Sequence, residues 1–326
     1  MKAQISLPNS DPIYDLYGGG FLGQFTRLAL LLDVFTPLSS GPKSAEQVAA
    51  SCSANTFGIR TLLNYLSSVD VLDYELETGI FSLTRSASAF LVRGEKTYAG
   101  DWVLANTDPI LWDKMLQTLR TGTSFGYALP WAQDAWLESY SPSRFEYTLK
   151  MWQTVGVEIN QGQPFLILDL ACGCGIKTLA FAKANNSVQV ACVDSEDVLE
   201  VARDLALRFG ISEKTTFFPA DILSDDFGKE KYHAALLGLI TYILTPGQNL
   251  EVFRRVYQAL KPSGILVIDA IMSTQQPSEW ASRATLLMST WNGGAAYTVD
   301  EYQTWLKEVG FSKVTQHNEQ LLSAIK

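Results

Sequence analysis

Residues 168–180 of the chain read LDLACGCGIKTLA, and this stretch decides the fold. The apolar residues 165–169 predict a short buried strand, and residues 176–184 predict a helix. Between them, Gly173 and Gly175 let the backbone turn tightly and approach a ligand without an intervening side chain. The first turn of the helix also offers unpaired N–H groups. This order predicts that a nucleotide-like ligand binds at the carboxyl edge of a parallel sheet.

The acid at the end of this first strand indicates which ligand the turn binds. A dinucleotide-binding turn follows the pattern G-x-G-x-x-G, and Thr178 occupies the third glycine position here. The carboxylate of Asp169 suits a ligand that carries an ammonium group, as S-adenosylmethionine does. We therefore expect S-adenosylmethionine rather than a dinucleotide. The alternative is a tight strand-to-helix turn that binds nothing.

Two further acids follow the second and third predicted strands. Asp194 offers two oxygens that can accept from both ribose hydroxyls, although it or Ser195 could instead cap the next helix. Asp221 can accept from an adenine amine, with Ile222 against the ring. Three acids at successive strand ends around one turn strengthen the prediction of cofactor binding.

The C-terminal half alternates strands with helices, which predicts an α/β fold with a doubly wound, Rossmann-like parallel sheet. The further predicted strands are residues 188–193, 215–218, 234–240, 265–269, 311–317 and 321–326. The further predicted helices are residues 196–209 and 249–260, and residues 261–264 are predicted to form a turn.

Residues 13–100 have the pattern of a helical domain with one hairpin. Ser44 and Gln47 form a capping signature, and residues 56–67 have apolar side chains at helical spacing. Two strand-like runs flank Thr78-Gly79 and predict a hairpin. Helices followed by a hairpin are typical of a winged helix.

A winged helix ordinarily binds DNA, but the charge of this one argues against that role. Arg60 is the only basic residue in the helix at 56–67. Residues 21–35 form a long apolar stretch that is too apolar to face water as a broad patch. We therefore expect this domain to form a homodimer.

Length and composition limit the remaining possibilities. A chain of 326 residues fits about two domains, here residues 1–104 for dimerisation and 105–326 for catalysis, with 105–160 as a helical substrate or linker region. A net charge of −9 gives no general attraction to nucleic acid or to anionic membranes. Without an apolar span, signal peptide or paired cysteines, we expect a cytoplasmic protein. Cys172 and Cys174 have too few partners to predict a metal site.

Together these features resemble the class I S-adenosylmethionine-dependent methyltransferases. Residues 41–49 (GPKSAEQVA), 58–66 (GIRTLLNYL) and 81–87 (FSLTRSA) resemble the dimerisation domain of small-molecule O-methyltransferases of the plant caffeate and bacterial polyketide-tailoring type. Residues 236–246 and 254–264 resemble that family's fourth strand and the helix after it. The resemblance implies methyl transfer to a small, largely apolar or aromatic natural product, with oxygen favoured as the acceptor atom. The cofactor residues are then Asp169, Gly173, Gly175, Asp194, Ser195, Asp221, Ile222 and Gly238.

Many members of that family carry a catalytic histidine just after the fourth strand, where this chain has Tyr242 or Ile243. His233 and His317 are expected to lie away from the cofactor edge. Because the sulfonium supplies the reactivity, positioning alone can suffice for some nucleophiles. We predict that Tyr242 orients the acceptor, with aromatic packing as its alternative role. C- or N-methylation, a non-methylating reaction with the same cofactor, and a winged-helix regulator that binds an effector remain alternatives.

Substrate contacts are expected from two helical stretches. The family resemblance places one of them, before the first strand, beside the substrate, and the other recurs at helical spacing after Asp269. Core packing explains some of these residues equally well. The candidates are Met151, Trp152, Trp280, Arg283, Leu287 and Met288.

Overall fold

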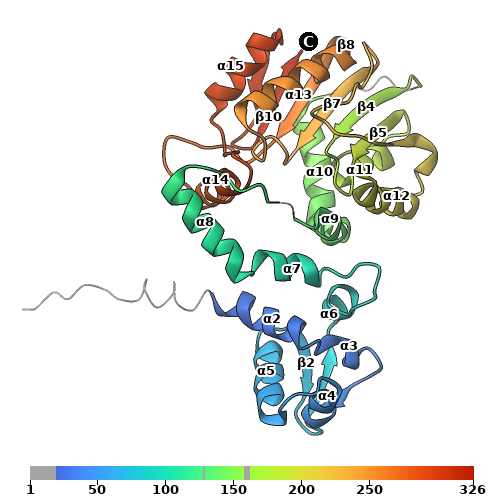
Figure 1. The fold of residues 1–326 in the computed structure, drawn as a ribbon. Coiled ribbons are helices and arrows are strands. Elements are labelled where there is room, and N and C mark those ends of the chain that lie inside the picture. The colour runs from blue at the N-terminus through green and yellow to red at the C-terminus, as the bar shows by residue number, and fades with distance from the viewer. Residues whose placement is uncertain (1–19, 128, 158–161) are drawn as a thin grey trace, which may run out of the picture. The chain divides into compact units, whose positions relative to one another are not determined.

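The computed structural model describes residues 20–127, 129–157 and 162–326 (Figure 1). The chain divides into two compact units, Met1–Leu111 and Trp112–Lys326. The sequence-based boundary between residues 104 and 105 stays a prediction. Residues 13–19, at the start of the predicted dimerisation region, lie outside the described residues. No helix among those described combines the length and the apolar character needed to cross a membrane.

The first unit combines short helices with a three-stranded antiparallel sheet in the order β1-β3-β2. The predicted hairpin around Thr78-Gly79 is confirmed, and so is the cap at Ser44, whose hydroxyl accepts the N–H of Gln47 while its own N–H donates to the Gln47 side chain. The winged-helix description itself stays a prediction. The elements are α2 (Phe21–Leu31), α3 (Phe35–Leu38), β1 (Lys43–Ser44), α4 (Ala45–Ser51), α5 (Thr56–Ser68), β2 (Leu72–Glu75), β3 (Ile80–Leu83), α6 (Arg85–Phe90) and α7 (Gly100–Asn106).

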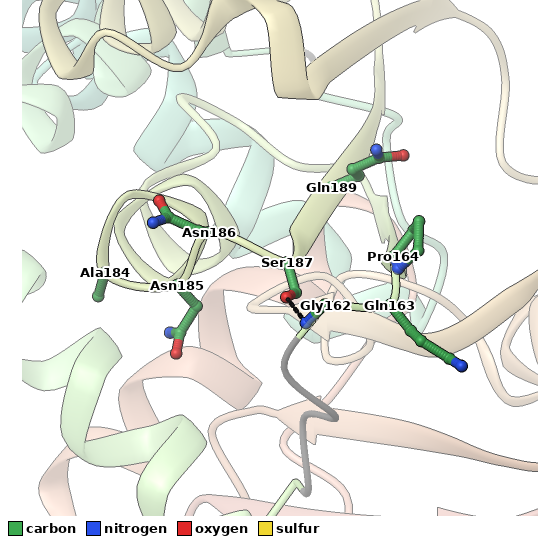
Figure 2. Close-up of a pocket in the computed structure, with 8 residues that line it drawn as sticks. All are labelled: Gly162, Gln163, Pro164, Ala184, Asn185, Asn186, Ser187 and Gln189. Atoms are coloured by element: carbon green, nitrogen blue, oxygen red, sulfur yellow. Dashed lines mark hydrogen bonds between the residues drawn. The ribbon is translucent and has the colours of Figure 1, made fainter.

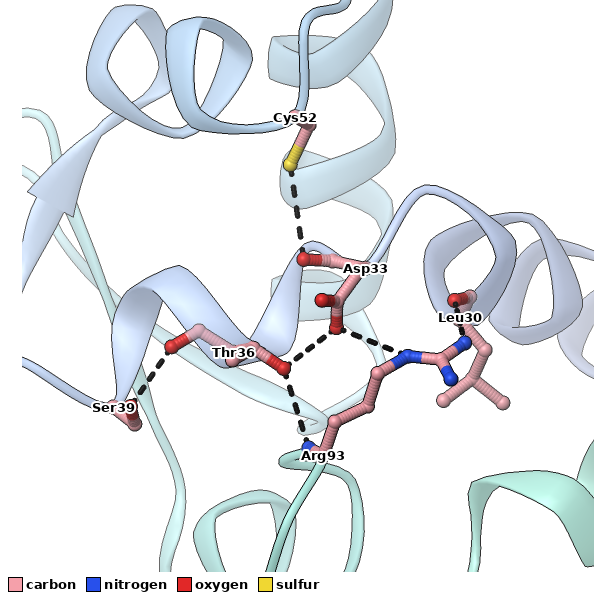
Figure 3. A network of polar contacts seen from close by, with 6 residues as sticks. All are labelled: Leu30, Asp33, Thr36, Ser39, Cys52 and Arg93. Atoms are coloured by element: carbon pink, nitrogen blue, oxygen red, sulfur yellow. Dashed lines mark hydrogen bonds and ion pairs between the residues drawn. The ribbon is translucent and has the colours of Figure 1, made fainter.

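A polar network holds the junction of α2 and α3, where the apolar stretch 21–35 is divided (Figure 3). Asp33 takes a left-handed φ of 54°, which turns the chain between the two helices. Its carboxylate accepts from the Thr36 hydroxyl at 2.6 Å and lies 3.5 Å from the Arg93 guanidinium. The same hydroxyl accepts from the backbone N–H of Arg93, whose guanidinium donates to the carbonyl of Leu30. The segment after α6 is thereby fixed to the end of α2.

The second unit is built on a seven-stranded sheet in the order β6-β5-β4-β7-β8-β10-β9. The five neighbouring strands β6, β5, β4, β7 and β8 are parallel, and β10 is antiparallel to both of its neighbours. The prediction of a doubly wound α/β fold is confirmed. The strands are β4 (Phe165–Leu170), β5 (Val188–Asp194), β6 (Thr215–Pro219), β7 (Tyr232–Gly238), β8 (Leu260–Asp269), β9 (Val314–Gln316) and β10 (Leu321–Ile325).

Helices cover both faces of this sheet, and each face has its own apolar core (Figure 1). Trp152, Leu179 and Leu205 belong to the core under α10, α11 and α12, whereas Phe253 and Tyr302 belong to the core under α13 and α15. The helices are α8 (Pro109–Thr121), α9 (Trp131–Ser139), α10 (Pro142–Val155), α11 (Ile176–Ala184), α12 (Glu196–Phe209), α13 (Pro246–Ala259), α14 (Glu279–Trp291) and α15 (Val299–Val309), with a short 3-10 turn at Ser212–Lys214.

Several predicted boundaries differ from the structure; the strand predicted at 311–317, for example, covers only Val314–Gln316. Three of the differences have a local reason. The strand predicted at 234–240 ends at Gly238, because Leu239 takes a left-handed φ of 59°. The helix predicted from residue 249 starts at Pro246, because Thr245 and Gln248 form a capping box before it. The predicted turn at 261–264 is an irregularity inside β8, where Ser263 has a φ of 62°.

Candidate active site

A cavity of about 230 Å³ lies at the carboxyl ends of β4, β5 and β7 in the second unit. This is the edge at which the sequence predicts a nucleotide-like ligand. Five segments line it: Trp131, Asp134, Ala135 and Glu138 of α9; Asp169, Ala171, Cys172, Gly173, Ile176 and Lys177 around the glycine-rich turn; Asp194 and Val198; Gly238, Leu239, Ile240, Tyr242 and Ile243 after β7; and Asn292 after α14.

The glycine-rich turn has the backbone geometry that its sequence requires. Gly173 and Gly175 have φ values of 57° and 72°, which favour glycine. A Cβ on Gly175 would lie 2.9 Å from the Leu179 side chain, whereas a Cβ on Gly173 would meet only a Glu138 oxygen at 4.0 Å. Gly173 therefore presents bare backbone to the cavity. Ala171 also has a left-handed φ of 52°, so the turn holds a strained non-glycine residue beside the cavity.

Asp169, the next-to-last residue of β4, is a buried carboxylate, 2 % exposed. The hydroxyl of Thr178, at the position of the missing third glycine, donates to it at 2.6 Å. Burial raises the pKa of Asp169 to about 7, against the effects of that hydrogen bond and of the Lys177 charge. A bound cation would favour the ionised form of this carboxylate.

Asp194 stands at the end of β5, and both of its oxygens accept backbone hydrogen bonds. One accepts from the N–H of Gly173 at 2.9 Å and the other from the N–H of Ser195 at 2.8 Å. Burial raises its pKa, while these hydrogen bonds lower it. Each carboxylate oxygen can accept more than one hydrogen bond. Asp194 can therefore stabilise the glycine-rich turn and also accept hydrogen bonds from a ligand.

The sequence interpretation missed an ion pair at the cavity floor. The Nζ atom of Lys177 lies 2.9 Å from a carboxylate oxygen of Asp269, at the end of β8, although outside hydrogen-bonding alignment. The hydroxyl of Tyr147 donates to the other Asp269 oxygen at 2.8 Å. A Cβ on Gly238 would lie 2.9 Å from the Lys177 side chain, so the glycine at the end of β7 makes room for it. This ion pair joins α11, β7, β8 and α10 beneath the cavity.

The sequence interpretation also missed two carboxylates on α9. Asp134 and Glu138 line the cavity one helical turn apart, on the wall that also includes Trp131. Nothing in the α9 sequence marks which face of the helix meets the cavity. Arg144 of α10 lies 3.4 Å from Glu138.

Tyr242 lines the cavity, and it also packs on a small apolar cluster that includes Ala281 and Ala284 of α14. Its contact with the acceptor stays a prediction. Burial, together with the charges of Asp134 and Glu138, raises its pKa to about 12, against the Arg144 charge, which lowers it. Its phenol is therefore neutral at physiological pH and available as a hydrogen-bond donor.

Four of the predicted cofactor residues line the cavity: Asp169, Gly173, Asp194 and Gly238. Gly175 shapes the turn below it, and Ser195 precedes α12. Asp221 accepts from the N–H of Leu223 and from the Ser224 hydroxyl in the turn after β6, and Ile222 is buried in the core. The lining of the cavity does not extend to Asp221 or Ile222, whose ligand contacts stay predictions.

None of the predicted substrate residues is among those that line the cavity. Met151 and Trp152 belong to the core, where the Trp152 indole donates to the carbonyl of Lys177 and stacks on Phe181. On α14, Trp280 is 49 % exposed beneath the Arg283 guanidinium, Leu287 is half-buried and Met288 is buried. Met151 and Trp152 thus have the core packing that the sequence allowed as the alternative to substrate contact.

The two histidines have structural partners away from the cavity. His233 stacks on Phe165, accepts the N–H of Leu166 and lies 2.9 Å from the Lys261 ammonium at the amino end of β7. His317 follows β9 and bonds to the Ser323 hydroxyl of β10. Burial lowers the pKa of both imidazoles.

A second hollow lies at the opposite, amino-terminal edge of β4 and β5 (Figure 2). Gly162, Pro164, Ser187 and Gln189 are among its lining residues, and the Ser187 hydroxyl accepts the N–H of Gly162. No acidic or basic side chain lines it among the described residues. It offers no group for acid–base chemistry and lies away from the glycine-rich turn.

Comparison with known proteins gives two family matches. Residues 167–264 match the family described as a methyltransferase domain, and residues 15–93 match the O-methyltransferase dimerisation domain.

Individual relatives span nearly the whole chain. The S-adenosyl-L-methionine-dependent methyl transferase PigF of Serratia sp. is 23% identical and covers 94% of this chain and 92% of its own. The 3-hydroxy-5-methyl-1-naphthoate 3-O-methyltransferase of Streptomyces sahachiroi is 22% identical, covering 92% and 89%. Among solved structures, human N-acetylserotonin methyltransferase in complex with SAM aligns with a TM-score of 0.69 at 18% identity, over 99% of both chains.

Proposed function

Because the chain belongs to the S-adenosylmethionine-dependent methyltransferases that carry an O-methyltransferase dimerisation domain, we propose that it methylates a hydroxyl of a small aromatic natural product. The observation that carries the proposal is the cavity at the glycine-rich turn, in which Asp169, Gly173 and Asp194 meet.

The residues of this cavity fit the methyl donor. S-adenosylmethionine carries a sulfonium and an ammonium, and the cavity lining includes the carboxylates of Asp134, Glu138, Asp169 and Asp194. We propose that Gly173 gives the donor access to bare backbone, that Asp169 faces its ammonium and that Asp194 accepts from its ribose hydroxyls. The bound donor supplies an electrophilic methyl group, which the protein needs only to align with its acceptor.

The acceptor class follows from the apolar lining residues of the cavity and from the relatives. Trp131, Ile240, Tyr242 and Ile243 contribute aromatic and apolar surface that suits a flat aromatic molecule. Two relatives are named for a naphthoate and a phenazine acceptor. We propose that the Tyr242 phenol donates a hydrogen bond to the acceptor oxygen and so orients it.

We also propose a homodimer, built on the matched dimerisation domain. The exposed apolar side chains of α2 support it, since Leu28 is 48 % and Leu31 57 % exposed. On α8, Trp112, Leu116 and Leu119 recur on one helical face and are also exposed. Apolar faces of this kind mark interfaces more often than free surface.

Isothermal titration calorimetry with S-adenosylhomocysteine tests the proposed cofactor site. The wild-type protein is expected to bind it, and Asp194→Ala should weaken binding by about 1–3 kcal/mol, the cost of leaving ligand hydroxyls unpaired. Glu200→Gln, at an exposed position of α12, is the matched control and should bind as the wild type does. Unchanged affinity in Asp194→Ala would remove Asp194 from the site, and a wild-type protein that binds no S-adenosylhomocysteine would contradict the proposed function.

A further inference from the structure

The cavity lining includes a carboxylate to which the proposed function gives no role of its own. Asp134 lies on α9 and lines the cavity together with Tyr242. Its side chain is only partly exposed, and no hydrogen bond to its carboxylate is found among the described residues. Asp169 and Asp194, by contrast, each accept at least one hydrogen bond, and Glu138 lies 3.4 Å from the Arg144 guanidinium. Among the described carboxylates that line the cavity, Asp134 is thus the one with neither a hydrogen-bond donor nor an ion-pair partner.

The charges around Asp134 favour its neutral form. Burial and the Glu138 carboxylate one turn along α9 raise its pKa to about 6, against the Arg144 guanidinium of α10, which lowers it. Arg144 itself lies 3.4 Å from Glu138, and Lys177, the lysine that lines the cavity, pairs with Asp269. A carboxyl group in such surroundings exchanges a proton near neutral pH, where a general base works best.

The other groups that could take a proton from an acceptor are unsuitable. His233 and His317 lie away from the cavity with partners of their own. The raised pKa of Tyr242 keeps its phenol protonated, so that it donates rather than accepts a proton. Asp169 and Asp194 stand at the glycine-rich turn, where the proposed function assigns them to the cofactor.

We propose that Asp134 is the general base of the reaction and that it takes the proton of the acceptor hydroxyl. This inference rests on the proposed function and adds a residue to it. The acceptor O–H bond breaks, its proton bonds to an Asp134 carboxylate oxygen, and the electron pair stays on the acceptor oxygen. That oxygen forms the new C–O bond with the methyl carbon, while the pair of the broken C–S bond remains on sulfur. The proton then leaves Asp134 for water.

The roles of the two α9 carboxylates differ in this scheme. Asp134 contacts the acceptor, whereas Glu138 is a positioning residue that acts through its charge on Asp134 and through Arg144. Replacing Asp134 therefore removes the base, and replacing Glu138 changes the pH at which the base works.

The test uses the full-length protein, S-adenosyl-L-[methyl-¹⁴C]methionine and two probe acceptors, 2-naphthol and 1-hydroxyphenazine. Wild-type kcat/KM should rise with pH around pH 6, because the carboxyl group of Asp134, whose pKa is raised, ionises there. Asp134→Asn should lower kcat by roughly 10²–10⁴-fold and abolish that rise. Glu138→Gln should move the rise to lower pH, because it removes a charge that raises the pKa of Asp134. Glu200→Gln on exposed α12 is the control and should leave the profile unchanged.

A readout without catalysis separates a base from a cofactor ligand. Affinity for S-adenosylhomocysteine in Asp134→Asn should equal that of the wild type. In protein labelled with ¹³C at aspartate carboxyls, one resonance that is missing from Asp134→Asn should titrate near pH 6 and shift to lower pH in Glu138→Gln.

Each failure has its own signature. If the wild type methylates neither probe, the proposed hydroxyl acceptor is wrong. If it methylates a probe and Asp134→Asn keeps both its rate and its pH profile, the proposed function stands and the inference is overturned. If Asp134→Asn instead loses affinity for S-adenosylhomocysteine, Asp134 belongs to the cofactor site and the inference is likewise overturned.

Discussion

Lys177 and Asp269 show what one residue pair contributes to the cavity floor. Their side chains are 10% and 3% exposed, so either charge left alone would be buried without compensation. We predict that Lys177→Met lowers the free energy of unfolding by about 3–5 kcal/mol, measured by urea denaturation. The double variant Lys177→Met/Asp269→Asn should recover part of that loss, because it also removes the buried Asp269 charge that Lys177→Met leaves without a partner. If the losses of Lys177→Met and of Asp269→Asn, each measured alone, add up to the loss of the double variant, the two groups are not coupled.

At the same scale, the histidines provide a test of the chemistry. His233 and His317 have partners between strands at positions away from the cavity. We predict that replacing both by Gln lowers the rate of methyl transfer far less than the roughly 10²–10⁴-fold expected for loss of a base, provided that the protein folds. Tyr242→Phe should have the larger effect, because it removes the proposed donor to the acceptor. A pH limb near 6.5 that vanishes in the double histidine variant would contradict this assignment.

Individual residues also show where sequence reasoning stops. Asp169, Gly173 and Asp194 could be predicted because the strand–turn–helix pattern fixes which side chains reach the sheet edge. Asp134, Glu138 and Lys177 could not, since their role depends on which way α9 and α11 face after packing. Met151 and Trp152 could be assigned neither to the substrate site nor to the core from the sequence, because an apolar helix face beside a site and one in the core have the same periodicity.

At the scale of elements, the network around Asp33 makes a local contribution that can be measured. The Thr36 hydroxyl donates to Asp33 and accepts from the backbone N–H of Arg93 (Figure 3). We predict that Thr36→Val, which keeps the shape but loses both bonds, lowers the free energy of unfolding by about 1–3 kcal/mol. Ser40→Ala, in an exposed turn nearby, is the control and should change stability by less. A Thr36→Val variant as stable as the wild type would show that the network is dispensable.

Element order was predictable from the sequence, and element ends were less so. Alternating apolar runs identified the central strands because a buried parallel strand leaves little room for polar residues. The end of β7 was missed because Leu239, an ordinary apolar residue, takes a left-handed conformation there. The sequence carries no sign of such strain, which only the surrounding fold imposes.

At the scale of the whole molecule, one variant tests the proposed homodimer. We predict that light scattering at micromolar concentration gives the mass of a dimer. Leu28→Glu/Leu31→Glu should shift it toward the monomer, because it places charges on the exposed apolar face of α2. Glu75→Gln, on exposed β2, is a control that should leave the mass unchanged. A wild-type protein that is monomeric at these concentrations would contradict the proposed dimer.

The most direct test of the account is a crystal structure of the wild-type protein with S-adenosylhomocysteine. The account predicts that the ligand occupies the cavity at the carboxyl ends of β4, β5 and β7, against Gly173, with its ribose hydroxyls bonded to Asp194 and its sulfur directed to the side of Tyr242 and Asp134. S-adenosylhomocysteine bound elsewhere, for example in the hollow beside Ser187, or bound in the cavity without contact to Asp194, would contradict it.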